Sequence, residues 1–163
     1  MTLTTIILRL LAAAVIGFLI GLNRFAHHQD IGVRTLGIVS LGAAGLVVAA
    51  LETGTGSDQL AAASRIIQGI VTGIGFLGAG VIVRRERDRK VHGLTTAATV
   101  WAAAAIGTLC GLGAWPVAVS LAVLVALVLV AGGPIERLLT DRYGLKTGES
   151  PAPSARVEPP RAP

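Results

Sequence analysis

Two short patterns in this 163-residue chain hold residue types that could do chemistry: a glycine triplet and a histidine-rich connection. Gly73, Gly75 and Gly78 spell G-x-G-x-x-G, which in soluble enzymes holds a dinucleotide pyrophosphate between a strand and a helix. Here the triplet lies in the middle of an apolar run, and no carboxylate occurs over residues 93–98, where the ribose partner would stand. We therefore reject dinucleotide binding and predict no cofactor.

The histidine-rich connection offers His27, His28 and Asp30 as metal-ligand types. Adjacent histidines on a helix point to different faces, and no third or fourth ligand follows at a useful spacing. With His92 added, a soft, zinc-like site stays open beside the plainer interpretation, which is a set of interfacial polar residues. We predict no metal site. The chain also lacks a nucleophile with a base and an orienting group, so we do not expect an enzyme.

The elements that would position any site are apolar segments long enough to cross a membrane. Apolar residues make up 53% of the chain, and the run from Ile66 to Val83 holds 18 residues without a charge, about what a helix needs to cross roughly 30 Å of hydrocarbon. Five such spans are predicted, none of which contains Asp or Glu: Leu3–Leu22, Thr35–Leu51, Ile66–Val83, Leu94–Leu112 and Trp115–Gly132. The predicted fold class is an all-α membrane protein, a bundle of about five transmembrane helices.

The basic residues predict the orientation of this bundle. Twelve of the fourteen fall on one predicted side: Arg24, Arg34, Arg84, Arg85, Arg87, Arg89, Lys90, Arg137, Arg142, Lys146, Arg156 and Arg161. By the positive-inside rule, the N-terminus lies outside and the C-terminus lies in the cytoplasm. The basic residues behind the net charge of +5 then set the topology and contact anionic lipid. We therefore expect no nucleic-acid partner.

The chain divides into two predicted parts. Residues 1–133 form the transmembrane domain, and residues 134–163 form a cytoplasmic tail that holds most of the prolines. The start of this tail, PIERLLTDRYGLK, is predicted to lie along the membrane interface as a short amphipathic helix, followed by Pro-rich disorder.

Glycines recur within the spans at the small-xxx-small spacing that lets helix backbones approach closely. The predicted packing glycines are Gly17, Gly21, Gly69, Gly73, Gly75, Gly78, Gly107 and Gly111. We expect Gly69 and Gly73 in particular to touch a neighbouring helix. A glycine-lined pore or substrate path is the alternative, since exposed backbone at membrane depth must line a cavity.

Polar residues at the predicted cytoplasmic span ends could converge into a recognition surface. This polar rim comprises Asn23, Arg24, Arg34, Thr35, Arg84, Thr95 and Thr96. Cations there could meet lipid phosphate, an anion or a partner's carboxylate; alternatively, Arg24 and Arg34 only fix topology. Arg9 lies inside the first span, where it either extends to the outer interface or pairs within the bundle.

Four stretches carry a family resemblance: GLNR, GVRTLGIVSLGAA, GIGFLGAGVI and HGLTTAATVWAAAAIG. Together they resemble the MgtC/SapB family of bacterial inner-membrane proteins, over about residues 10–113. The resemblance implies a multi-pass plasma-membrane protein, linked in some members to growth at low magnesium and to survival in host cells. Many members have an acidic residue where Asn23 stands. We expect a short, SapB-like member without a C-terminal cytoplasmic domain.

Two functional classes follow for a protein of this kind. The first is a regulatory factor that acts through contacts with other membrane proteins or with itself; the second is a small oligomeric ion or solute transporter or channel. Magnesium prefers hard oxygen ligands that usually include carboxylates, and the predicted spans contain none. Their polar residues, mostly threonines, suit cross-bonding between helices better than ion conduction. We therefore favour the regulator.

Overall fold

A computed structural model describes residues 1–26, 32–54, 56, 58–84 and 91–143. Over these residues the chain forms α1 (Leu3–Ala26), α2 (Val33–Thr53), α3 (Asp58–Val81), α4 (Leu94–Leu112) and α5 (Trp115–Tyr143), with two-residue strands β1 (Val83–Arg84) and β2 (Val91–His92) between α3 and α4. All five helices are long and apolar enough to span a membrane. The predicted all-α membrane bundle is therefore confirmed.

Helix α5 corrects one predicted boundary. It continues through Pro134 to Tyr143, so the residues that follow Gly132 extend the fifth span rather than forming a separate interfacial helix. A proline costs a helix one backbone hydrogen bond and commonly kinks it, but it does not have to end the helix. The disorder predicted for the tail concerns residues 147–163, which lie outside the described part of the chain.

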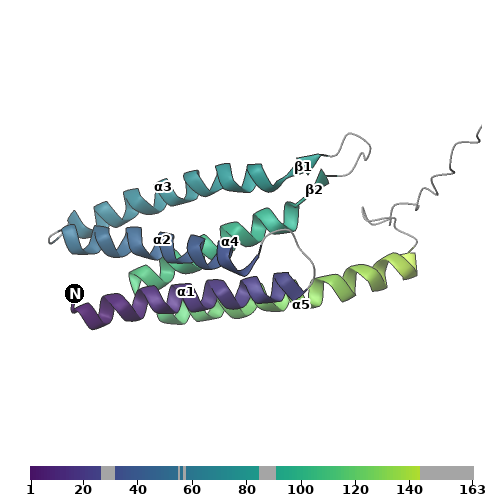
Figure 1. Cartoon of the computed structure of the whole chain (residues 1–163), viewed down its shortest axis with the longest axis horizontal. Coiled ribbons are helices and arrows are strands. Elements are labelled where there is room, and N and C mark those ends of the chain that lie inside the picture. Colours follow the sequence, from purple (N-terminus) through teal and green to yellow (C-terminus); the bar gives the residue numbers. More distant parts are fainter. Residues whose placement is uncertain (27–31, 55, 57, 85–90, 144–163) are drawn as a thin grey trace, which may run out of the picture.

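The helices alternate in direction, and α2 lies between α1 and α4, packing along both (Figure 1). The N-terminal amine of Met1 forms an ion pair with Glu52 near the end of α2, which ties the start of α1 to the end of α2. Leu36, Val47, Val100 and Ile106 are among the fully buried side chains of α2 and α4. The core therefore lies where α2 meets its two neighbours.

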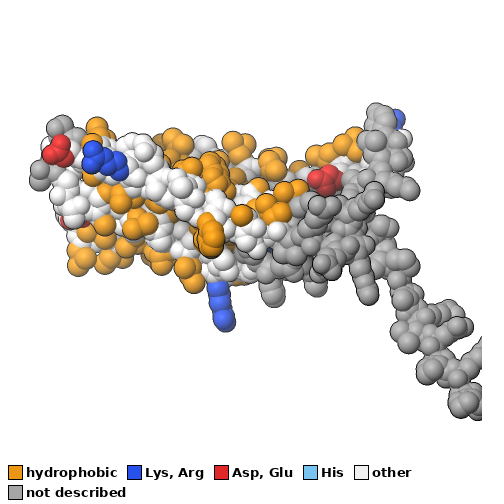
Figure 2. Space-filling view, turned by 90° about the horizontal axis from the view of Figure 1, so that it is seen from above, with side chains coloured by type: hydrophobic (Ala, Val, Ile, Leu, Met, Phe, Trp, Pro, Cys, Tyr) orange, Lys and Arg blue, Asp and Glu red, His pale blue; other side chains and the backbone are white. Residues whose placement is uncertain are grey.

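Helices α3 and α5 lie at the margins of this core. Only 11% of the apolar window of α3 and 6% of that of α5 are buried within the chain. Large apolar side chains such as Phe76, Val128 and Leu138 are exposed, and the described surface is mostly hydrophobic or uncharged, with isolated charged groups (Figure 2). An exposed apolar surface of this extent suits contact with lipid.

The described part of the connection from α3 to α4 is a short antiparallel strand pair in which Val83 pairs with His92 and Arg84 with Val91. Gly93 follows with φ +88°, and a Cβ there would collide with the Val81 carbonyl oxygen. Glycine is therefore needed for the chain to leave β2 and start α4.

Candidate functional site

Four of the predicted packing glycines lie directly against α2. A Cβ on Gly17 would lie 2.6 Å from the Leu36 carbonyl oxygen, and one on Gly21 would lie 2.6 Å from the Val33 Cα. From the other side, Gly107 lies on the backbone of Ser40, and a Cβ on Gly111 would lie 2.7 Å from the Ala44 carbonyl oxygen. Because glycine has no side chain, the backbones of α1, α2 and α4 can approach one another closely. Such close packing matters in a membrane, where helix association gains nothing from excluding water.

Ser40 is the point where these contacts meet. Gly17 of α1 and Gly107 of α4 approach it from two sides, and its residue surface is fully buried. Its hydroxyl oxygen has no hydrogen-bond partner among the described residues. The sequence marks Ser40 only as a polar residue within a span, because nothing in the order of residues shows which helices will enclose it.

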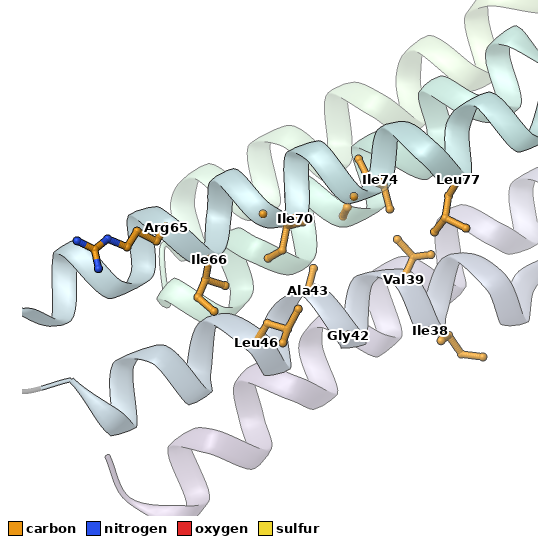
Figure 3. Close-up of a pocket in the computed structure, with 13 residues that line it drawn as sticks. Ile38, Val39, Gly42, Ala43, Leu46, Arg65, Ile66, Ile70, Ile74 and Leu77 are labelled. Carbon is orange, nitrogen blue, oxygen red and sulfur yellow. The ribbon is translucent and has the colours of Figure 1, made fainter.

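The third-span glycines behave differently, and the predicted close contact is absent at Gly69, Gly73 and Gly75 among the described residues. A Cβ on Gly69, Gly73 or Gly75 would meet no atom within 4 Å, whereas one on Gly78 would make an ordinary 3.7 Å contact with the Ala97 Cβ. Larger side chains on α3, including Ile66 and Ile70, point toward α2 and hold the two backbones apart (Figure 3). Spacing alone does not show which face of a helix meets a neighbour.

The polar rim contains one buried interaction between helices. Arg24, near the end of α1, is 7% exposed, and its Nη2 donates a 2.7 Å hydrogen bond to Oγ1 of Thr96 in the first turn of α4. A buried guanidinium must keep hydrogen-bonding partners, because an unpaired buried charge is costly. Arg24 and Thr96 therefore join α1 to α4 as part of the structure, and the half-buried Asn23 precedes them.

The other rim residues lie at the same end of the bundle as this interaction. Arg34 and Thr35 are exposed in the first turn of α2, and Thr95 is exposed in the first turn of α4. Arg84 lies on β1 at that end. The structure therefore separates a buried pair, Arg24 with Thr96, from three exposed rim residues, Arg34, Thr35 and Thr95.

The opposite end holds a second arginine contact between helices, which is partly buried and bears on the alternatives for Arg9. Its Nη1 donates a 2.8 Å hydrogen bond to the carbonyl oxygen of Gly111, near the end of α4. Gly113 there adopts φ +76°, and backbone bonds from Gly113 and Ala114 satisfy the carbonyls of Cys110 and Leu109. These bonds leave Gly111 among the last carbonyls, at the negative end of the helix dipole, where a cation is favoured. Arg9 thus bonds to α4, which favours the pairing within the bundle.

Sequence reasoning missed a further contact near this end. The side-chain amide of Gln59, at the start of α3, donates a 2.7 Å hydrogen bond to the Leu51 carbonyl oxygen in the last turn of α2. The pattern that could have indicated it is a polar residue within the first turn of a helix that follows a short connection.

Metal binding receives no support from the described residues, among which no group of three His, Cys, Asp or Glu side chains could hold an ion. The histidine-rich connection of His27, His28 and Asp30 lies outside the described residues, and His92 is placed only as part of β2.

A comparison with family models now decides the relationship, because the model of the MgtC family matches residues 10–138. The chain belongs to the MgtC family. This confirms the resemblance and extends it beyond the four stretches that carried it, through most of α5.

Relatives of this MgtC-family chain occur in several bacteria. It is 43% identical over 115 residues to Protein SrpB of Synechococcus elongatus, covering 66% of this chain and 63% of SrpB. It is 48% identical over 107 residues to Protein MgtC of Salmonella typhimurium, covering 66% of this chain and 43% of that protein. Protein MgtC of Brucella abortus is 45% identical over 105 residues, covering 64% and 41% of the two chains. The matches thus span about two fifths to three fifths of these relatives. No solved structure matches the chain.

Proposed function

We propose that this multi-pass MgtC-family protein is a regulatory factor of the bacterial plasma membrane. It acts through contacts with other membrane proteins and supports adaptation to low magnesium or survival inside host cells. The family membership supports the general class, and the names of the relatives suggest the setting. In this proposal the N-terminus lies outside and the rim end of the bundle faces the cytoplasm, as the distribution of basic residues predicts.

One observation favours a regulator over a transporter. Helices α1, α2 and α4 touch through backbone at Gly17, Gly107 and Gly111, which leaves no space for a hydrated path between them. Apart from the Ser40 hydroxyl, the polar side chains named in this part form bonds within and between helices: Arg24 bonds to Thr96, and the Thr99 and Thr108 hydroxyls donate to carbonyls one turn earlier. Such bonds stabilise a bundle and offer nothing to a passing ion.

The exposed rim residues are the proposed recognition surface. Arg24 is committed to Thr96, whereas Arg34, Thr35 and Thr95 are exposed at the same end and accessible to a partner. An arginine offers a planar fork that binds a carboxylate or phosphate through two hydrogen bonds, which lysine cannot reproduce. Arg34 is therefore the residue we expect to recognise an acidic group on a partner.

The test is complementation of low-magnesium growth in a bacterium that lacks its own MgtC-family protein and shows that phenotype. Arg34→Lys keeps the charge that sets topology but loses the fork, so we expect normal membrane levels and impaired growth. Arg142→Lys, an exposed arginine near the end of α5, is the matched control and should complement fully. Full complementation by Arg34→Lys would remove the recognition role.

A small oligomeric transporter or channel is the second candidate, and the exposed glycines of α3 favour it. Gly69 and Gly73 leave open space beside the helix, which a second copy could close into a path shared between chains. Flux of magnesium and other ions into proteoliposomes containing the purified full chain separates the two candidates. A selective, protein-dependent flux would replace the regulator with the transporter.

A further inference from the structure

An apolar groove runs between α2 and α3 and encloses about 610 Å³. Isoleucines of α3 form one wall, Leu46 and Val39 of α2 form part of the other, and Ala104 of α4 completes the lining. Gly42, Gly69 and Gly73 also line it, and the missing side chains at these positions provide its width. The volume lies within the range of about 300–1,000 Å³ typical of ligand pockets.

One cation, Arg65, stands at the end of this otherwise apolar groove (Figure 3). The side chain is exposed and is directed along α3 away from the groove, toward the start of the helix. It directly precedes the 18 uncharged residues of Ile66–Val83. Arg65 is therefore at the boundary of the hydrocarbon layer, at the depth where headgroups begin.

The length of the groove matches one leaflet of a bilayer. Leu77, at its far end, follows Arg65 by twelve residues. At 1.5 Å per residue, the two are about 18 Å apart along the helix, close to half of a hydrocarbon core of roughly 30 Å. An acyl chain that starts at the boundary would thus end near Leu77.

We propose that this groove binds one glycerophospholipid, with an acyl chain between α2 and α3 and the headgroup phosphate on Arg65. The charge complementarity selects a phospholipid, because the guanidinium fork fits phosphate oxygens and the rest of the lining is apolar. A helix from a second copy would fill the apolar part but would place no required anion beside Arg65. The site is separate from the polar rim, which lies at the other end of the bundle.

Native mass spectrometry of the full chain, purified in mild detergent, tests the proposal with two lipids of identical acyl chains. Dioleoylphosphatidylglycerol should bind as a single copy, and dioleoylglycerol, which lacks the phosphate, should bind at least about tenfold more weakly. Arg65→Gln should weaken phosphatidylglycerol binding by a similar factor while leaving dioleoylglycerol unaffected. Because Arg65 is exposed, this variant should fold normally.

Two leucine substitutions on α3 test the groove itself. Gly73→Leu places a side chain in the groove and should abolish the bound lipid, whereas Gly75→Leu, which does not line the groove, should retain it. Arg142→Gln is the matched charge control and should also retain it. Equal binding of the two lipids, or unchanged binding by Arg65→Gln, would overturn the phosphate assignment. A chain dimer that Gly73→Leu dissociates would show the groove to be an interface between copies.

Discussion

The closest helix contact in the bundle makes Gly107→Ala the sharpest test of the fold. A Cβ there would lie 2.7 Å from the Ser40 carbonyl carbon and 2.8 Å from its Cα, and it would overlap the carbonyl oxygen. All three obstacles are backbone atoms of α2, which cannot rotate away as a side chain can. The substitution must therefore move α4 and α2 apart.

The size of the effect follows from this geometry. Ordinary van der Waals contact begins near 3.4 Å, so the Ser40 carbonyl carbon alone requires the helices to separate locally by about 0.7 Å, and the overlapping carbonyl oxygen requires more. A gap of that size forfeits about a quarter to a half of the dispersion energy of the affected contacts. Overpacking of a core typically costs about 1–3 kcal/mol, and we expect the upper end because the obstacle is backbone.

The assay compares Gly107→Ala with Gly75→Ala in thermal unfolding of the purified protein in detergent. Both variants gain the same intrinsic helix preference of alanine, about 1 kcal/mol, so their difference isolates the packing term. A Cβ on Gly75 meets nothing within 4 Å, and this variant should match or exceed the wild type. A difference of about 3 kcal/mol corresponds to roughly 6–12 °C between the two unfolding midpoints. Equal midpoints would refute the contact between α4 and Ser40.

Three further predictions concern the arginines and the orientation. Arg24→Lys should lower the free energy of unfolding by about 1–3 kcal/mol, because the buried bond to Thr96 is lost. Arg34 is exposed, so Arg34→Lys should leave the free energy of unfolding unchanged. Chemical unfolding of both variants checks this, and equal stability would contradict the buried role of Arg24. Arg9→Met should cost a similar amount, because the Gly111 carbonyl loses its charged donor, and normal unfolding of that variant would place Arg9 at the lipid interface instead. Alkaline phosphatase fused at Lys146 should be inactive and a fusion in the turn at Gly113 active; the reverse pattern would invert the proposed orientation.

The order of residues by itself determined the class of fold. Five apolar runs without Asp or Glu predict five helices, because the backbone polar groups of a chain in lipid must be satisfied within each segment. The family was also readable, since the glycine-rich third span and the GLTTAAT stretch resemble the MgtC/SapB family, and the family match confirms it. The fifth helix was placed too short, because Pro134 marks a possible end and only the complete helix shows that the chain continues.

Only the tertiary structure decided which polar and small residues meet. Gly69 with Gly73 and Gly107 with Gly111 share one spacing, yet the first pair faces open space and the second lies against α2. Arg24 and Arg34 have equal standing in the sequence, but one is buried on Thr96 and the other is exposed. Spacing fixes which residues share a helix face. The rotation of each helix, which sets what that face meets, results from packing against residues far away in the chain.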